Sequence, residues 1–334
     1  CGGFSAVCGS SLATAATMSK VAMPSMRRFG YHDSLATGAI AAGGTLGILI
    51  PPSVILIIYG LLTESDIGKL FIAGIVPGLL GVALYLIAVM VSVRVDPSLA
   101  PEVGEPVPMS RNDLVGVLAT IALFVFIMGG IYGGVFTPIE AAGMGAAASV
   151  VIAAVVGGLT RKALWGALLD AAVATAMIFA IIIGAEIFGN FITFAGLPDA
   201  LSDLVQNLNL GPWVVIGLIV VTYLVLGTVL ESLSMVLLTV PVFYPLVMQL
   251  DFGAGPLADP DMILIWFAII VVVATEISLI TPPVGMNVFV LRSVLPEVSL
   301  GTMFRGVLWF WAVDVVRIAL IVAFPAITLW LVMP

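Results

Sequence analysis

Apolar residues fill long stretches of this chain, and the lengths of those stretches match membrane-crossing helices. A helix needs about 20 apolar residues to cross the hydrocarbon core of a bilayer. Uninterrupted stretches of that size predict plain spanning helices at 71–93, 113–134, 139–157, 171–195 and 306–333. A membrane barrel would instead show segments of about ten residues with alternating polarity. The pattern therefore predicts an all-α polytopic membrane protein.

Four further apolar stretches are interrupted by glycine, proline or hydroxyl-bearing residues, at 4–26, 36–62, 213–249 and 262–292. Proline removes a backbone donor and blocks a continuous helix, so each interruption predicts a break. We interpret the first and third stretches as re-entrant helical hairpins and the second and fourth as discontinuous helices. Function is expected at these broken stretches.

Composition agrees with a membrane protein and removes one class of partner. Of the 334 residues, 62% are hydrophobic and 9% are charged, whereas soluble domains are about 25% charged. The net charge is −8, and the sparse Lys and Arg residues form no basic footprint for nucleic acid. We therefore expect membrane lipids around the chain and no nucleic-acid partner.

The basic residues between the helices predict an orientation, because cytoplasmic loops are enriched in Lys and Arg. If 4–26 and 213–249 are hairpins that enter and leave on one side, the other apolar stretches cross the membrane in alternating directions. Of these basic loop residues, only Lys69 then lies on the outer face. The cytoplasmic face then carries Arg27, Arg28, Arg94, Arg111, Arg161, Lys162, Arg292 and Arg305.

The broken stretches occur twice, which indicates an internal repeat. Pro24 and Pro245 close the two predicted hairpins, and Gly-Ile-Leu-Ile-Pro-Pro at 47–52 matches Ser-Leu-Ile-Thr-Pro-Pro at 278–283. The two hairpins open to opposite sides in the predicted orientation, so the copies are inverted, as in many secondary transporters. Because the second copy has a longer lead before its hairpin, we expect roughly 100 residues to precede this chain.

The repeat divides the chain into four predicted parts. Residues 1–62 form the first transport part, with the end of one hairpin and the first broken helix. Residues 63–212 form linking and scaffold helices with a horizontal connector. Residues 213–292 form the second transport part, and 293–334 the final scaffold helix.

Each helix break leaves carbonyls unpaired at one half-helix end and amides unpaired at the next. Such groups cost several kcal/mol each inside a bilayer unless they find partners. A sodium ion can take the carbonyls, and an anionic substrate can take the amides. Oxygen ligands suit a hard cation, and no organic cofactor is expected.

The hairpin tips offer the facing half of each site. The run 8–14 is small and rich in hydroxyl groups, so its backbone can approach an ion closely. The run 227–232 is its counterpart and adds the Glu231 carboxylate. Serine is also a common helix N-cap, and the capping and ligand roles are compatible.

The other ionisable residues receive simpler interpretations. Glu140 is expected to complete a capping box with Thr137, and Asp314 is expected to pair with Arg317 three residues later. Glu276 lies at membrane depth beside the second break, which favours a functional role. We expect no arginine near either break, so selectivity would be shared with another protein.

Three motifs in order carry a resemblance to a known family. They are Leu-Gly-Ile-Leu-Ile-Pro-Pro-Ser at 46–53, Gly-Ile-Tyr-Gly-Gly-Val-Phe-Thr-Pro-Ile-Glu-Ala-Ala at 130–142 and Glu-Ile-Ser-Leu-Ile-Thr-Pro-Pro-Val-Gly-Met-Asn at 276–287. The chain resembles the large membrane subunit of tripartite ATP-independent periplasmic (TRAP) transporters over essentially its whole length. Where the family often has Asp after the second tip glycine, this chain has Glu231.

The resemblance implies a multi-pass protein of the bacterial inner membrane that is not an enzyme. It further implies a small four-helix membrane subunit, separate or fused, and a periplasmic substrate-binding protein. Import of an organic acid, such as a C4-dicarboxylate or sialic acid, would be coupled to sodium and would proceed by an elevator movement.

Candidate site residues come from the breaks and the tips, with most of the sodium ligands carried over by motif. The sodium candidates are Ser10, Ser11, Thr45, Gly47, Ser232, Ser278, Thr281 and Pro282. The substrate candidates are Ser10, Ser11, Thr14, Pro52, Ser53, Glu231, Glu276, Pro283, Gly285 and Asn287. Two alternatives remain open: a stand-alone sodium-dependent dicarboxylate symporter of related fold, and an ion channel.

Overall fold

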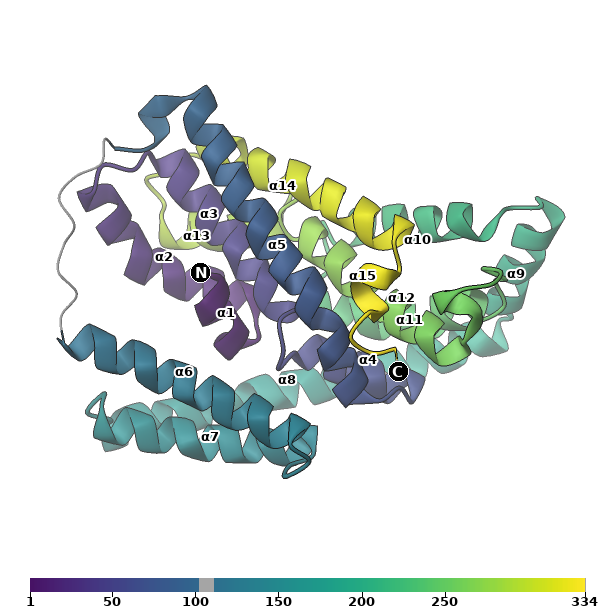
Figure 1. Cartoon of the computed structure of the whole chain (residues 1–334), viewed down its shortest axis with the longest axis horizontal. Helices are drawn as coiled ribbons and strands as arrows, with labels where there is room; N and C mark the ends of the chain where they lie inside the picture. The colour runs from purple at the N-terminus through teal and green to yellow at the C-terminus, as the bar shows by residue number, and fades with distance from the viewer. Residues whose placement is uncertain (102–110, 334) are drawn as a thin grey trace. The chain divides into compact units, whose positions relative to one another are not determined.

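The computed structural model describes residues 1–101 and 111–333, and these residues are largely helical (Figure 1). In chain order the helices are α1 Gly2–Cys8, α2 Ser11–Arg28, α3 Asp33–Thr45, α4 Val54–Thr63, α5 Ile67–Val95, α6 Arg111–Tyr132, α7 Pro138–Val155, α8 Arg161–Phe194, α9 Leu197–Asn207, α10 Pro212–Leu226, α11 Ser232–Val247, α12 Pro260–Ser278, α13 Met286–Val294, α14 Leu300–Ala323 and α15 Ala326–Leu329. Short 3₁₀ turns are η1 Leu46–Ile48, η2 Pro97–Leu99 and η3 Pro256–Ala258.

Among the described residues, six helices are long and apolar enough to cross a membrane: α5, α6, α7, α8, α12 and α14. They include every plain span predicted from the sequence. The prediction of an all-α membrane protein with plain spans is therefore confirmed. Some boundaries were wrong, because α8 begins at Arg161 and not at 171, and the last span runs from Leu300 to Ala323 and not from 306 to 333. Pro325 follows and opens the separate turn α15.

The described chain divides into two compact units. The smaller unit holds α6, α7 and the part of α8 up to residue 184. Helices α6 and α7 pack together as an antiparallel pair (Figure 1). The capping box predicted for α7 is confirmed, because Thr137 Oγ1 accepts from Glu140 N at 3.2 Å and Glu140 Oε2 accepts from Thr137 N at 2.9 Å.

The larger unit is built around α12, whose residues from Met262 to Ser278 are all buried. Helices α5, α10, α11 and α14 all pack against it. A second tight packing joins α14 to α3, where Gly38 and Gly306 face each other without side chains. A Cβ atom on Gly38 would lie 2.6 Å from the Gly306 carbonyl carbon, so only glycine permits this approach.

The helices break at both proline pairs, as the sequence predicted. Helix α3 ends at Thr45, the 3₁₀ turn η1 follows it directly, and α4 begins at Val54. Helix α12 ends at Ser278, and α13 begins at Met286. Proline by itself does not end every helix, because α2 continues past Pro24 and α11 past Pro245.

The second halves of the two broken helices, α4 and α13, pack against different helices. Helix α4 contacts α11, whereas α13 contacts α2 and α3. Segments far apart in sequence therefore meet at the breaks. This arrangement positions the candidate site.

Candidate functional site: two helix breaks and the tips that face them

The tip between α1 and α2 is a tight turn made by Gly9 and Ser10. Gly9 has φ 66°, which suits glycine, and it ends α1. Ser10 is the N-cap of α2 and accepts a hydrogen bond from Ala13 N at 3.4 Å. The expected capping role of this serine is confirmed, and the amides of the first turn of α2 point to the tip.

This tip lies against the first helix break. Ser5 Oγ of α1 donates to the Gly44 carbonyl oxygen at 2.8 Å. Gly47 packs directly on Ser5, since an added Cβ would lie 2.7 Å from the Ser5 carbonyl carbon. The Ser11 carbonyl oxygen is also close to Gly44, because a Cβ added to Gly44 would lie 3.2 Å from it. Small residues on both segments make this contact possible.

Two hydroxyl groups beside this contact have no hydrogen-bond partner. Ser11 Oγ and Thr14 Oγ1 are buried and unpaired. A buried hydroxyl without a partner is rare, because its desolvation is not compensated. Both residues are sodium or substrate candidates from the sequence, so the orphaned oxygens lie where a ligand was expected.

The hydroxyls of the first break are turned toward local carbonyls. Thr45 Oγ1 donates to Ala42 O at 2.8 Å. Ser53 donates to the Ile48 carbonyl, and it also caps α4 by accepting from Leu56 N at 3.2 Å. Each hydroxyl uses its hydrogen in these bonds, so lone pairs on the oxygens remain. Such oxygens suit a hard cation.

The tip between α10 and α11 has an acidic cap. Glu231 is the N-cap of α11, and its Oε2 accepts from Leu233 N at 2.9 Å and from Ser234 N at 3.3 Å. Its Oε1 accepts from Ser232 Oγ at 2.7 Å. Gly227 in this tip packs on Ser278, because an added Cβ would lie 2.5 Å from the Ser278 Cβ. The second tip therefore touches the second break.

The second break carries its own hydroxyl groups. Ser278 Oγ donates to Thr275 O, and Thr281 Oγ1 donates to Ile277 O, each at 2.7 Å. Thr281 Oγ1 also accepts from Trp311 Nε1 at 3.0 Å. The prolines that follow, Pro282 and Pro283, are exposed, and Gly285 at φ 58° starts α13.

Asn287 links the second break to the helix before the first. Its Nδ2 donates to the Ala41 carbonyl of α3 at 3.0 Å, and its backbone N–H donates to the Leu279 carbonyl at 3.1 Å. The Leu279 carbonyl is one of the groups that the break leaves without a helical partner. Asn287 Oδ1 is buried and unpaired. The candidate residues of the two breaks thus belong to one packed assembly.

Sequence reasoning missed an arginine beside the second break. Arg317 of α14 ion-pairs with Glu276, and its Nη2 lies 3.1 Å from Asp314 Oδ1. The expected Asp314–Arg317 pair is present, but the expectation of no arginine near a break is wrong. All three side chains are fully buried. The sequence does contain a signal for this cluster. Glu276, Asp314 and Arg317 all lie in apolar stretches at membrane depth, where charged side chains usually pair with one another.

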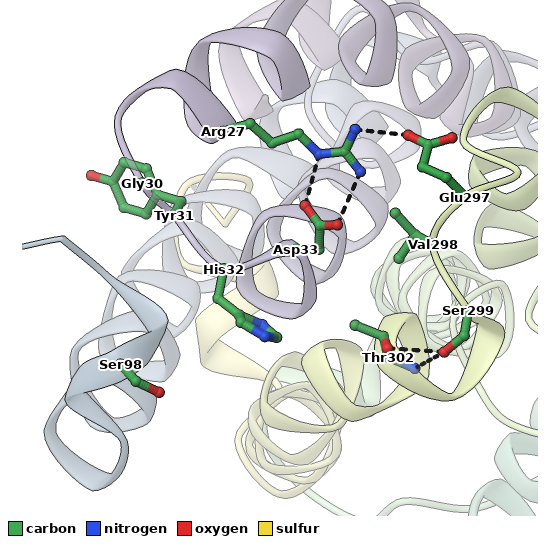
Figure 2. Close-up of a pocket in the computed structure, with 10 residues that line it drawn as sticks. All are labelled: Arg27, Gly30, Tyr31, His32, Asp33, Ser98, Glu297, Val298, Ser299 and Thr302. Carbon is green, nitrogen blue, oxygen red and sulfur yellow. Dashed lines mark hydrogen bonds and ion pairs between the residues drawn. The ribbon is translucent and has the colours of Figure 1, made fainter.

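A separate polar pocket of about 570 Å³ opens beside the ends of α2 and α3 (Figure 2). Arg27 donates to both oxygens of Asp33, at 2.8 and 2.9 Å, and to Glu297 at 2.7 Å. These carboxylates raise the pKa of Arg27. The pKa of Glu297 is lowered, mainly by a hydrogen bond from the Glu297 backbone N–H and also by the hydrogen bond from Arg27. The guanidinium is already paired, so this pocket is a poor site for an organic anion.

In the ranges 1–101 and 111–333, no cluster of three His, Cys, Asp or Glu side chains could hold a metal ion. Transition-metal sites are usually built from such clusters. The oxygen atoms of the breaks and tips are the remaining candidates for cation binding.

The amino-acid sequence matches a known family over almost its whole length. Residues 1–327 match the family described as "Tripartite ATP-independent periplasmic transporter, DctM component". Members of this family are membrane permeases of TRAP transporters and are not enzymes.

Individual relatives are proteins of bacterial TRAP systems. The chain is 36% identical to the C4-dicarboxylate TRAP transporter large permease protein of Pseudomonas aeruginosa, covering 98% of this chain and 74% of that protein. It is 32% identical to the sialic acid TRAP transporter large permease protein of Vibrio cholerae, with the same coverage. It is 33% identical to the isethionate TRAP transporter permease protein of Oleidesulfovibrio alaskensis, over 87% of this chain and 44% of that longer protein. The chain therefore belongs to the DctM family of TRAP transporter permeases, which are multi-pass proteins of bacterial membranes.

Proposed function

We propose that this chain is the permease of a sodium-coupled importer of a small organic acid, and that the acid is delivered by a periplasmic binding protein. The observation that carries this proposal is the contact of each helix break with a pair of helices, α1–α2 or α10–α11, that is joined by a capped tip. Ser5 meets Gly47 at the first break, and Gly227 meets Ser278 at the second. In each pair, one segment supplies serine and the other glycine. Such pairing supports two inverted copies of one ion-binding device.

The residues present fit sodium. Ser11 Oγ and Thr14 Oγ1 are buried oxygens without partners, as expected beside a bound cation. The first ion would be held by Ser10, Ser11, Thr45 and Gly47, and the second by Ser232, Ser278, Thr281 and Pro282. Sodium flowing down its gradient supplies the free energy of uptake. The chain's own task is to present hydroxyl and carbonyl oxygens that replace water around the ion.

Four helices begin at the breaks or at the tips, and their N-termini suit an anion. Helices α2, α4, α11 and α13 begin at Ser11, Val54, Ser232 and Met286, next to substrate candidates. Their first amides carry partial positive charge and lack helical partners. The substrate candidates around these termini are Ser10, Ser11, Thr14, Pro52, Ser53, Glu231, Pro283, Gly285 and Asn287. Glu276, the remaining candidate, is held by Arg317 and would act on the substrate through that pair.

The relatives point to the chemical class of substrate without naming one acid. Proteins at 32–36% identity are named for a C4-dicarboxylate, for sialic acid and for isethionate. These are organic anions with different acidic groups. We infer that this chain also carries an organic anion, with a carboxylate as the first choice.

Two partners and a movement complete the proposal. A small membrane subunit would accompany this chain, since the isethionate relative carries the combined name DctMQ and is much longer than the matched region. The helix tips and broken helices would move as one body past a scaffold, as an elevator. The tight contacts among α2, α3 and α13 support their movement together.

Ser11→Ala and Thr281→Ala are each expected to weaken sodium binding by about tenfold, because each removes an oxygen ligand worth about 1–1.5 kcal/mol. Sodium titrations of the purified chain, followed by tryptophan fluorescence, would measure this. Trp311 donates to Thr281 and serves as a local reporter. Choline chloride keeps the ionic strength constant, and Thr175→Ala on exposed α8 is the control. Unchanged sodium affinity in both variants would contradict the ligand assignment.

Uptake into liposomes tests the function itself. A candidate periplasmic binding protein would first be screened against succinate, sialic acid and isethionate for the anion it retains. The permease, the small subunit and that binding protein should then accumulate the anion only with an inward sodium gradient. Uptake with sodium but without the binding protein would favour the stand-alone symporter, and flux without sodium coupling would favour a channel.

A further inference from the structure

A continuous chain of polar side chains joins the two helix breaks through the interior of the larger unit. It begins at Thr45, the last residue of α3, and ends at Glu276, two residues before α12 ends. Tyr85 of α5 and Asp314 and Arg317 of α14 lie between them. All five side chains are buried. We call these five residues the polar chain.

Each member of the polar chain contacts the next. Thr45 Oγ1 lies 3.3 Å from the Tyr85 hydroxyl oxygen, and the Tyr85 hydroxyl donates to Asp314 Oδ2 at 2.6 Å. Asp314 Oδ1 forms an ion pair with Arg317 Nη2 at 3.1 Å without a hydrogen bond, and Arg317 Nη2 donates to Glu276 Oε2. The guanidinium carbon lies 5.9 Å from the centre of the Tyr85 ring.

The first link has two possible arrangements. The Thr45 hydroxyl has one hydrogen and two acceptors in reach, Ala42 O at 2.8 Å and the Tyr85 oxygen at 3.3 Å. Because Tyr85 donates its own hydrogen to Asp314, only Thr45 can donate across the 3.3 Å gap. Turning the Thr45 hydroxyl also turns the lone pairs that it can offer to an ion. Ion binding at Thr45 is therefore linked to the position of Tyr85.

The far end of the polar chain has atoms that make no hydrogen bond. Glu276 Oε1 and Arg317 Nη1 are buried and have no hydrogen-bond partner. Gly81 of α5 lies directly against this guanidinium, which fills the space that a side chain there would occupy. A shift of Arg317 would move Glu276 and, through α12, the adjoining Ser278. Packed interiors transmit such shifts because they are dense.

We propose that Tyr85, Asp314 and Arg317 are positioning residues that couple the two breaks, so that sodium bound at one break raises the sodium affinity of the other. The inference rests on the proposed sodium binding at the breaks. None of the three residues is a candidate ligand. They act through Thr45 at one end and through Glu276 and α12 at the other.

Tyr85→Phe tests the coupling, because it removes only the hydroxyl that bridges Thr45 and Asp314. The purified full chain would be titrated with sodium chloride at constant ionic strength, with tryptophan fluorescence as the signal. The wild-type titration is expected to be sigmoidal. The variant is expected to give a Hill coefficient near one and a sodium affinity lower by about fivefold or more, the usual range for coupling between sites.

Tyr59→Phe is the matched control. The Tyr59 hydroxyl is also buried and donates to Leu264 O at 2.9 Å, but it lies outside the polar chain. A purely structural effect would lower the melting temperature in both variants and leave the sigmoidal shape in both. The coupling role predicts loss of that shape in Tyr85→Phe alone.

Asp314→Asn is the second test, and it serves if Tyr85→Phe does not fold. It keeps the side-chain size and leaves the Glu276–Arg317 pair, so a folded protein is expected with the same loss of the sigmoidal shape. The Tyr85→Phe and Asp314→Asn effects should not add, since both act on one chain. A sigmoidal titration retained in either folded variant would overturn the coupling. A wild-type protein that does not respond to sodium would overturn the proposed function as well.

Discussion

Replacing Arg317 by Met is expected to destabilise the protein by about 3–5 kcal/mol, because two buried carboxylates lose their partner. Glu276, Asp314 and Arg317 are each fully buried, and the guanidinium contacts both acids. Removing one member of a buried ion cluster leaves a charge that neither water nor protein satisfies. The free energy of unfolding of the purified chain, measured by denaturant titration in detergent, checks this value.

Arg305→Met is the matched control for this prediction. Arg305 lies on the same helix, α14, but is exposed and forms no ion pair with residues 1–101 or 111–333. The same charge is removed, so a general effect of net charge would appear in both variants. Stability loss no greater than in Arg305→Met would show that the cluster contributes little to the fold.

Neutralising the acids should rescue the Arg317 variant. When Glu276→Gln and Asp314→Asn are added, no buried charge remains without a partner. Replacing a whole buried cluster by uncharged groups is often close to neutral for stability. Recovery of most of the lost free energy would therefore identify charge, and not the volume of the Arg317 side chain, as the cause.

The helix breaks could be predicted from sequence because their cause is local. Two successive prolines cannot continue a helix, and α3 and α12 end within a few residues of them. The N-caps at Ser10 and Ser53 follow from equally local chemistry, since a hydroxyl there accepts from the first helical turn. The end of α14 was missed because the apolar run continues past Pro325. Hydropathy alone does not place helix ends.

The polar chain could not be predicted, because its members are far apart in sequence. Asp314 and Arg317 were expected to pair from their spacing on one helix. Their other partners, Tyr85 and Glu276, depend on how α5, α12 and α14 pack. That packing includes a close approach between α5 and α14, where Gly81 lies against the Arg317 guanidinium, and the sequence pattern does not specify partners across such contacts.

Alanine at Gly47 or at Gly227 is expected to lower sodium affinity by about tenfold, since overpacking of about 1–3 kcal/mol would separate a tip from its break. A Cβ on Gly47 would lie 2.7 Å from the Ser5 carbonyl carbon, which is backbone and cannot rotate away. A Cβ on Gly227 would lie 2.5 Å from the Ser278 Cβ. Sodium titration of each purified variant, with its melting temperature as a folding check, measures the effect.

Gly3→Ala and Gly217→Ala are the controls, one in each helix pair. Nothing lies within 4 Å of a Cβ at either position, and alanine favours a helix more than glycine does. Both controls should bind sodium as the wild type does and be at least as stable. If Gly47→Ala and Gly227→Ala behaved like these controls, close contact between tip and break would not be needed for ion binding. Weaker sodium binding in Gly47→Ala and Gly227→Ala, but not in the controls, would instead show that both breaks depend on the same close approach. The glycine lies on the break in the first contact and on the facing segment in the second.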